Sequence, residues 1–193
     1  TNCACPPVFL DKYMNDGAGN FARSSLGNGI SASATLIGDI DNDGDLDVIV
    51  EGGNPTNRLE KYVNDGTGIF TPASFGTPIG GLDSASLVDI DGDGDLDLIV
   101  AGYDAPLPPS KVYRYFNDGF GTFSGAVVRI LTNNGMPRIS SGDIDGDGDI
   151  DLIFSDSPPG LQGIERWIND GTGNFATAIL GPAAVGGGSF ASV

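Results

Sequence analysis

Two short motifs recur along the chain, and their spacing sets the size of the folding unit. The first is a run of alternating aspartates followed by apolar residues, and it starts at Asp39, Asp89 and Asp143, at spacings of 50 and 54 residues. The second motif, N-D-G-x-G-x-F, starts at Asn15, Asn64, Asn117 and Asn169. Self-similarity at about 50 residues is typical of repeat architectures. We therefore expect an array of small, similar units.

Each unit contains signals for four short strands. Branched apolar runs follow the aspartates at residues 46–50, 96–100 and 150–154, as in strands that are buried on both faces. Strands that end in an aromatic residue are expected at 10–14, 59–63, 112–116 and 164–168. The Asn-Asp-Gly sequence then favours a hairpin turn, and the next strand begins with Phe21, Phe70, Phe123 or Phe175. Ser/Ala segments at 31–38, 83–88 and 137–142 lead back to the aspartates.

This pattern predicts an all-β fold of four-stranded blades, arranged as a β-propeller or as an open blade array. The chain is expected to be one repeat array over residues 1–193. The predicted divisions are a partial blade at 1–30, blades at 31–82, 83–135 and 136–185, and the first strand of a further blade at 186–193.

The aspartate runs have the composition of a loop that binds a hard cation. In such a loop, oxygen ligands at positions 1, 3 and 5 converge on the ion, a glycine at position 6 allows a sharp turn, and position 7 contributes its backbone carbonyl. Here a further carboxylate at position 9 completes the ligand set. Calcium is favoured over magnesium because a flexible shell of six to eight oxygens suits the larger ion.

The predicted ligands are fifteen aspartates in three calcium sites. They are Asp39, Asp41, Asp43, Asp45 and Asp47 in the first loop, Asp89, Asp91, Asp93, Asp95 and Asp97 in the second, and Asp143, Asp145, Asp147, Asp149 and Asp151 in the third. Without an ion, like charges at ligand distances would repel by about 1 kcal/mol per pair in water and by more when desolvated. We therefore expect calcium to stabilise the fold by bracing the turn between two strands of one blade.

Together, the two motifs resemble the FG-GAP/VCBS repeat family of extracellular calcium-binding propellers, whose blade pairs D-x-D-x-D-G-x-x-D with a downstream N-D-G-x-G-x-F. Integrin α-subunit heads and some fungal and bacterial lectins are similar in architecture. The resemblance implies a secreted or cell-surface protein, but shared architecture does not transfer function.

Composition argues against several classes of protein. The net charge of −17 opposes binding to nucleic acid or to an anionic membrane surface. No stretch approaches the roughly 18 apolar residues of a membrane span, so no membrane insertion is expected. The chain has no histidine, and its two cysteines are Cys3 and Cys5, so common acid-base and nucleophilic sites cannot be built and we expect no enzyme. The two cysteines could remain free thiols or bond another segment or chain.

An aromatic residue and a basic residue directly before it recur in the same predicted strand of every unit. Trp167 aligns with Tyr13, Tyr62 and Tyr115, and this position is expected in the core. The basic residues one position earlier are expected to neutralise carboxylates between blades, and they are Lys12, Lys61, Arg114 and Arg166.

The function that these features favour is a calcium-stabilised, non-catalytic structural or adhesive repeat protein outside the cell. The chain enters in mid-unit, and Val193 precedes the place of a fourth aspartate loop, so we expect open sheet edges. Three arrangements would satisfy them: a longer propeller, a ring of several copies, or head-to-tail pairing that gives a filament. The expected partners are other copies of the chain, and the alternative partners are glycans or surface proteins. The alternative function is a carbohydrate-binding, lectin-like propeller.

Overall fold

A computed structural model describes residues 9–28, 35–51, 58–79, 81–103, 110–130, 138–155 and 164–180 of the chain. These residues form fourteen strands and no helix. In the part of the chain so described, nothing helical is long and apolar enough to cross a membrane.

The strands form four antiparallel sheets, each in sequence order. Sheet 1 has two strands, β1 (Phe9–Asn15) and β2 (Phe21–Asn28). Sheet 2 consists of β3 (Thr35–Gly38), β4 (Asp47–Glu51), β5 (Leu59–Asn64) and β6 (Phe70–Phe75). Sheet 3 consists of β7 (Gly81–Val88), β8 (Asp97–Tyr103), β9 (Ser110–Asn117) and β10 (Phe123–Ile130). Sheet 4 consists of β11 (Arg138–Gly142), β12 (Asp151–Ser155), β13 (Ile164–Asn169) and β14 (Phe175–Leu180).

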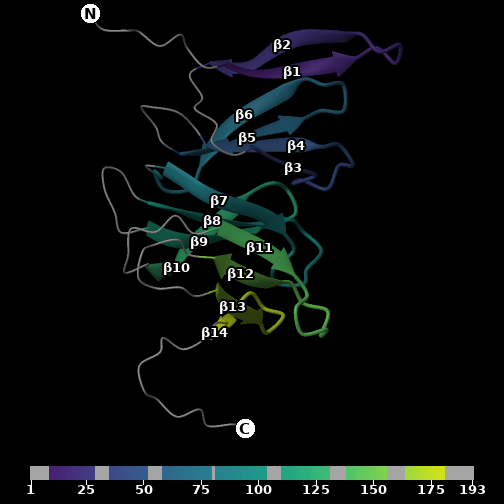
Figure 1. Cartoon of the computed structure of the whole chain (residues 1–193). Coiled ribbons are helices and arrows are strands. Elements are labelled where there is room, and N and C mark those ends of the chain that lie inside the picture. Colours follow the sequence, from purple (N-terminus) through teal and green to yellow (C-terminus); the bar gives the residue numbers. More distant parts are fainter. Residues whose placement is uncertain are drawn as a thin grey trace, which may run out of the picture.

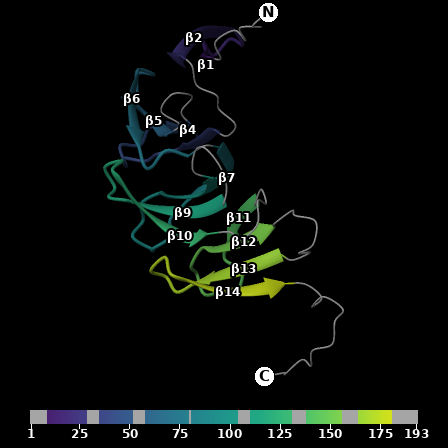
Figure 2. The same cartoon turned by 90° about the vertical axis from the view of Figure 1, so that its left-hand side faces the viewer.

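The sheets stack face to face in chain order, with sheets 1 and 4 at opposite ends of the stack (Figure 1). The view at right angles shows the same succession, in which sheets 1 and 4 remain far apart (Figure 2). The first strands of neighbouring sheets lie side by side, since β7 lies against both β3 and β11. The four-stranded antiparallel sheets confirm the prediction of propeller-like blades, and in the described residues they form an open array.

Strands in the middle of a sheet are buried because both faces of an inner sheet are covered. Within β8, Leu98, Ile99 and Val100 are fully buried. Side chains alternate between the two faces of a strand. Accordingly, Leu98 and Val100 pack in a cluster with Ile49 of sheet 2, whereas Ile99 packs with residues of sheet 4. In sheets 2 and 3, the apolar run after the aspartate loop therefore supplies two cores at once.

The aromatic position of the third strand lies in the core of every four-stranded sheet, as predicted. Tyr62 and Trp167 are each 2% exposed and Tyr115 is 3% exposed. Tyr13 is the exception at 59%, because among the described residues no sheet packs on that face of sheet 1. The core prediction is therefore wrong for Tyr13.

The sheets also define where the repeats divide. The predicted boundary between residues 82 and 83 falls inside β7, which begins at Gly81. The Ser/Ala segment is thus only part of this strand, which has a register shift between Leu82 and Ser84. The strand predicted for residues 186–193 lies outside the described residues, as do Cys3 and Cys5.

Candidate metal centre

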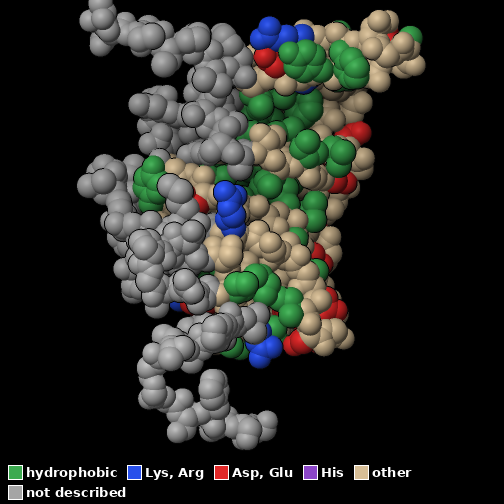
Figure 3. Space-filling model, in the orientation of Figure 1, with side chains coloured by type: hydrophobic (Ala, Val, Ile, Leu, Met, Phe, Trp, Pro, Cys, Tyr) green, Lys and Arg blue, Asp and Glu red, His purple; other side chains and the backbone are tan. Residues whose placement is uncertain are grey.

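Each aspartate loop joins the first two strands of a four-stranded sheet. The loops lie between β3 and β4, β7 and β8, and β11 and β12. Acidic side chains are visible along the right-hand edge of the stack in Figure 3. Positions 4 and 6 of every loop adopt a positive φ, with values of 58° at Asn42 and 94° at Gly44 in the first loop. Glycines occupy both positions in the other two loops. Asparagine tolerates this backbone region better than most side chains, which explains its presence at position 42.

Carboxylate oxygens converge in all three loops. In each group, one oxygen from each of three aspartates lies within 4.8 Å of the other two. The groups are Asp39, Asp41 and Asp43 in the first loop, Asp89, Asp91 and Asp97 in the second, and Asp143, Asp145 and Asp151 in the third. Positions 1 and 3 thus contribute in every loop, together with position 5 in the first and position 9 in the others.

The carboxylate at position 9 is fully buried and links two loops of the same sheet. Asp97 accepts hydrogen bonds from the Ile90 N–H at 3.0 Å and from the Asn117 N–H at 2.8 Å. Ile90 belongs to the aspartate loop, and Asn117 begins the N-D-G turn between β9 and β10. Asp47 and Asp151 form the same pair of bonds in sheets 2 and 4. We call this arrangement the aspartate clamp.

The position 7 side chains point away from the ligand groups and toward the N-D-G turns. A Cβ atom at Gly66, Gly119 or Gly171 would lie 2.3–2.7 Å from an oxygen of the position 7 aspartate of the same sheet. In these three turns a side chain in place of the glycine would displace the aspartate carboxylate, and the positive φ favours glycine independently. In sheet 3, Asp95 also accepts a hydrogen bond from the Asn42 amide of sheet 2 at 2.6 Å. With its side chain so engaged, position 7 leaves its backbone carbonyl for an ion.

Several ligand-group oxygens are buried without a hydrogen-bond partner in the described residues. They are Oδ1 of Asp39, Oδ1 of Asp41 and Oδ1 of Asp91. Burial, followed by the charge of Asp47, raises the pKa of Asp41. Burial raises the pKa of Asp97 to about 6, although the two backbone N–H groups act in the opposite direction. These carboxylates are therefore costly to keep ionised unless a cation compensates them.

The geometry fits a calcium ion. Calcium takes oxygen ligands at about 2.3–2.6 Å, so two oxygens that share one ion lie at most roughly 5 Å apart. The oxygens of each aspartate group satisfy this limit. The unpartnered buried oxygens and the all-carboxylate donor set match a hard cation rather than a soft metal.

The asparagine that opens an N-D-G turn has a second role that the sequence does not reveal. The sequence motif indicates only that it favours a turn. The Asn117 amide donates to the Ile40 carbonyl of sheet 2 at 2.7 Å and to the Leu96 carbonyl of its own sheet at 3.2 Å. Asn169 repeats this arrangement, with donation to Ile90 of sheet 3 at 2.6 Å and to Ile150 at 3.1 Å. In sheets 3 and 4 the asparagine thus connects two aspartate loops in different sheets.

The recurring basic residues bind backbone carbonyls, so the prediction that they neutralise carboxylates is wrong for three of them. Lys61 donates to the Gly121 carbonyl of the following sheet at 2.5 Å. Lys12 and Arg114 reach the equivalent carbonyls, those of Gly68 and Gly173. The acceptor in each case is the second glycine of an N-D-G-x-G turn, which a pattern within one repeat does not reveal.

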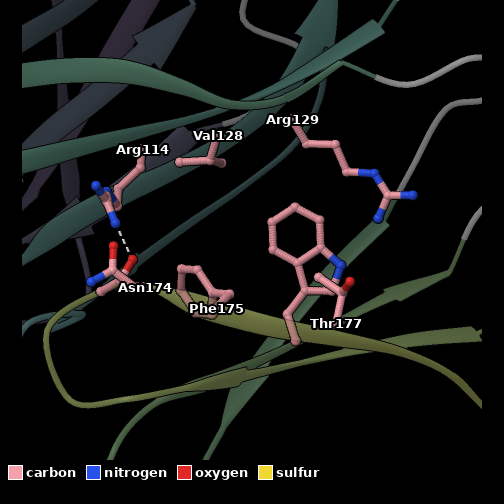
Figure 4. A pocket seen from close by; sticks show the side chains of 8 residues that line it. Arg114, Val128, Arg129, Asn174, Phe175 and Thr177 are labelled. Carbon is pink, nitrogen blue, oxygen red and sulfur yellow. Dashed lines mark hydrogen bonds between the residues drawn. The ribbon is translucent and has the colours of Figure 1, made fainter.

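A pocket of about 440 Å³ lies between sheets 3 and 4. Figure 4 shows Arg114 and Arg129 on the sheet 3 side and Asn174, Phe175 and Thr177 on the β14 side. Both arginines are engaged. Arg114 binds the Gly173 carbonyl, and Arg129 forms a two-pronged ion pair with Glu165. The Arg129 guanidinium lies 5.5 Å from the centre of the Trp167 ring, which leaves little of the ring open.

Fold and loops together define a repeat protein of four-stranded antiparallel sheets, each with an aspartate loop suited to a hard cation. Comparison with protein families gives a match to the FG-GAP-like repeat at residues 51–100 and 89–154. The two matches together span more than half of the chain, and the protein belongs to this family. Its repeats are typical of extracellular or surface proteins and are often calcium-binding. No curated protein and no solved structure matches the chain.

The asparagine contacts predict a graded set of stability losses. Asn117→Ala leaves the buried Ile40 carbonyl and the partly buried Leu96 carbonyl without this donor, and a buried unpaired acceptor costs about 1–3 kcal/mol. Asn64 donates only to Leu46 of its own sheet, and the Asn15 side chain accepts only from Gly17 of its own turn among the described residues. Urea unfolding should therefore rank the alanine variants in the order Asn117, Asn64, Asn15, from most to least destabilised. Equal losses at the three positions would contradict the inter-sheet role.

The raised pKa of Asp97 predicts an unusual dependence of stability on pH in metal-free buffer. The pKa is about 6 in the folded protein, against 3.8 for an unperturbed aspartate. Its contribution to stability is therefore fully present below about pH 4 and is lost as pH rises through about 6, by about 3 kcal/mol in total. Unfolding in urea between pH 4 and 7, followed by Trp167 fluorescence, measures this loss.

Calcium should reverse the slope of stability against pH, because the ion binds the ionised carboxylates. Asp97→Asn is the control, since it removes this titrating group and should reduce the loss of stability between pH 4 and 7 in metal-free buffer. A metal-free protein whose stability increases from pH 4.5 to 7 would contradict the assignment.

Proposed function

We propose that the protein is a non-catalytic structural or adhesive repeat protein that acts outside the cell, is stabilised by three calcium ions and associates with further copies of itself. The observation that carries the calcium part is the set of buried, unpartnered oxygens on Asp39, Asp41 and Asp91, which converge with neighbouring carboxylates. The ions would also reduce the net charge from −17 to −11, and so weaken the repulsion within the folded chain.

The position of the loops supports a structural role for the ions. Each loop precedes a buried strand and is linked by the aspartate clamp to the neighbouring turn of its sheet. An ion held by positions 1 and 3 would fix the loop against this clamp. Extracellular modules bind calcium at about 10⁻⁴ to 10⁻³ M, which matches an environment where calcium is always abundant.

A non-catalytic role agrees with the chemistry of the chain. It contains no histidine, and Asp41, Asp91 and Asp97, whose pKa values are raised, lie in or beside the carboxylate groups of the aspartate loops. Arg114 and Arg129, the cations of the pocket, are engaged by protein acceptors. Self-association is supported by the uncovered apolar side chains at both ends of the stack, such as Phe21 and Ile164.

Calcium removal is the direct test. At 10 mM calcium, a site with a dissociation constant near 10⁻⁴ M adds about 2.7 kcal/mol of stability. For a chain of this size, calorimetry should then show a melting temperature at least roughly 5 °C higher in calcium than in EGTA. Asp91→Asn should reduce this difference and leave two sites in a calcium titration. The control Asp65→Asn alters a turn aspartate outside the ligand groups and should leave the difference unchanged. A melting temperature that EGTA does not change would refute the proposal.

Carbohydrate binding is a second candidate function, favoured by the pocket between sheets 3 and 4. Asn174 and Thr177 bring polar groups to a concave site beside an aromatic ring. Trp167 is the only tryptophan of the chain, so a bound sugar should change its fluorescence. We expect Asn174→Ala to abolish any such change, whereas Asn20→Ala, at the equivalent turn position of sheet 1, should not. Absence of binding on a glycan array and of any fluorescence change would exclude this function.

A further inference from the structure

Every contact between neighbouring sheets follows one polar pattern. A basic residue on the third strand of one sheet donates to the second glycine carbonyl of the N-D-G-x-G turn in the next sheet. The three pairs, from the first sheet contact to the third, are Lys12 with Gly68, Lys61 with Gly121, and Arg114 with Gly173. We call the face that carries the basic residue the donor face, and the face that presents the turn the acceptor face.

Where the preceding sheet has an aspartate loop, a second hydrogen bond joins the two sheets in the opposite direction. The turn asparagine of the acceptor face donates to an isoleucine carbonyl of that loop, as Asn117 does to Ile40 and Asn169 to Ile90. A donor face and an acceptor face are therefore complementary in two directions. None of the three contacts joins two donor faces.

The apolar side chains of the two faces are also distinct. The donor faces of sheets 2 and 3 contribute buried aliphatic residues, such as Ile40 and Leu59 in sheet 2 and Ile90 and Val112 in sheet 3. The acceptor faces contribute the aromatic residue of the third strand and the phenylalanine that opens the fourth strand, such as Trp167 and Phe175 in sheet 4. Donor-face aliphatic residues thus meet these aromatic residues, together with aliphatic residues of the acceptor face such as Val100 and Leu152.

The donor face of sheet 4 has all of these features and is uncovered in the chain as described. Ile144 and Ile164 take the places of Ile40 and Leu59, yet they are 41% and 47% exposed. Arg166 takes the place of Lys61 and is exposed. It lies on the same face as Ile164 because side chains alternate along β13.

The acceptor face of sheet 1 is uncovered in the same way. Tyr13 and Phe21 are 59% and 62% exposed, whereas their equivalents in the other sheets are covered by the preceding sheet. Hydrophobic side chains are visible over sheet 1 at this end of the stack (Figure 3). A Cβ atom on Gly19 would meet nothing within 4 Å, whereas on Gly68, Gly121 or Gly173 it would meet atoms of the preceding sheet.

We propose that the donor face of sheet 4 binds the acceptor face of sheet 1 in a second copy of the chain. In this junction Arg166 donates to the Gly19 carbonyl, Asn15 donates to the Ile144 carbonyl, and Tyr13 and Phe21 cover the exposed isoleucines. The inference rests on the proposed self-association and specifies its surfaces. The occupant is a second copy because its sheet 1 carries the same aromatic residues, turn and asparagine that the donor faces bind within the chain. The contact joins two different surfaces, so it leaves one free face on each outer copy and can be repeated.

Single substitutions test the two faces separately. Tyr13→Glu blocks the acceptor face and Ile164→Glu blocks the donor face, and each should weaken association at least about tenfold in sedimentation analysis in calcium. Arg166→Ala should weaken it in the same direction without placing a charge in the contact. Phe120→Glu is the matched control, because Phe120 is 82% exposed in the β9–β10 turn of sheet 3 and belongs to neither of the two end sheets. Circular dichroism checks that each variant is folded.

A mixture of the two blocked variants gives the decisive result. Tyr13→Glu retains a donor face and Ile164→Glu retains an acceptor face, so the mixture should form one-to-one dimers and nothing larger. If neither Tyr13→Glu nor Ile164→Glu weakens association, or if their mixture stays monomeric, the proposed junction is overturned. Such a result would not overturn self-association through another surface. A wild-type protein that is monomeric in calcium at all concentrations would refute self-association itself. The calcium test by calorimetry is independent of either outcome.

Discussion

The aspartate clamp is the interaction on which the rest of the structure depends. In each four-stranded sheet, a fully buried carboxylate accepts one N–H from the aspartate loop and one from the N-D-G turn, as Asp97 does from Ile90 and Asn117. These bonds hold two loops, separated by a whole strand pair in sequence, at one end of the sheet. A buried carboxylate with two backbone donors and no cation remains expensive. The clamp therefore gives a physical reason for the same loop to bring together carboxylates that could hold a metal ion.

The clamp also fixes the groups by which the sheets recognise one another. Once Asp97 holds the Asn117 backbone, the Asn117 amide is placed to reach the Ile40 carbonyl in sheet 2. The glycine carbonyls of the same turn then face Lys61 of sheet 2. Loop geometry within one sheet and packing between sheets are thus parts of one network, and an ion that fixes the loop also stabilises the contact with the next sheet.

Features that repeat within one unit could be predicted from the sequence, whereas features made between units could not. Strand order, the N-D-G hairpins and the convergence of Asp89 and Asp91 follow from spacing and residue type, because each involves neighbours within one sheet. The partner of Lys61 is a backbone carbonyl some 60 residues away, and no side-chain pattern marks it. Asn42 illustrates the same limit. Its type suits a positive φ, but its bond to Asp95 depends on how two sheets stack.

The difference between the two faces of a sheet determines how such sheets can assemble. A sheet that carries basic donors on one side and turn carbonyls on the other stacks in the same direction in all three contacts of the described residues. A stack built in this way has unlike ends, such as the isoleucines around Arg166 and the aromatic pair Tyr13 and Phe21. Each end offers the groups that meet the other kind of end within the chain, and none of these three contacts joins two like faces. For the proposed association between copies we therefore expect a head-to-tail contact, and the rotation from one sheet to the next decides whether it closes into a ring or continues as a filament.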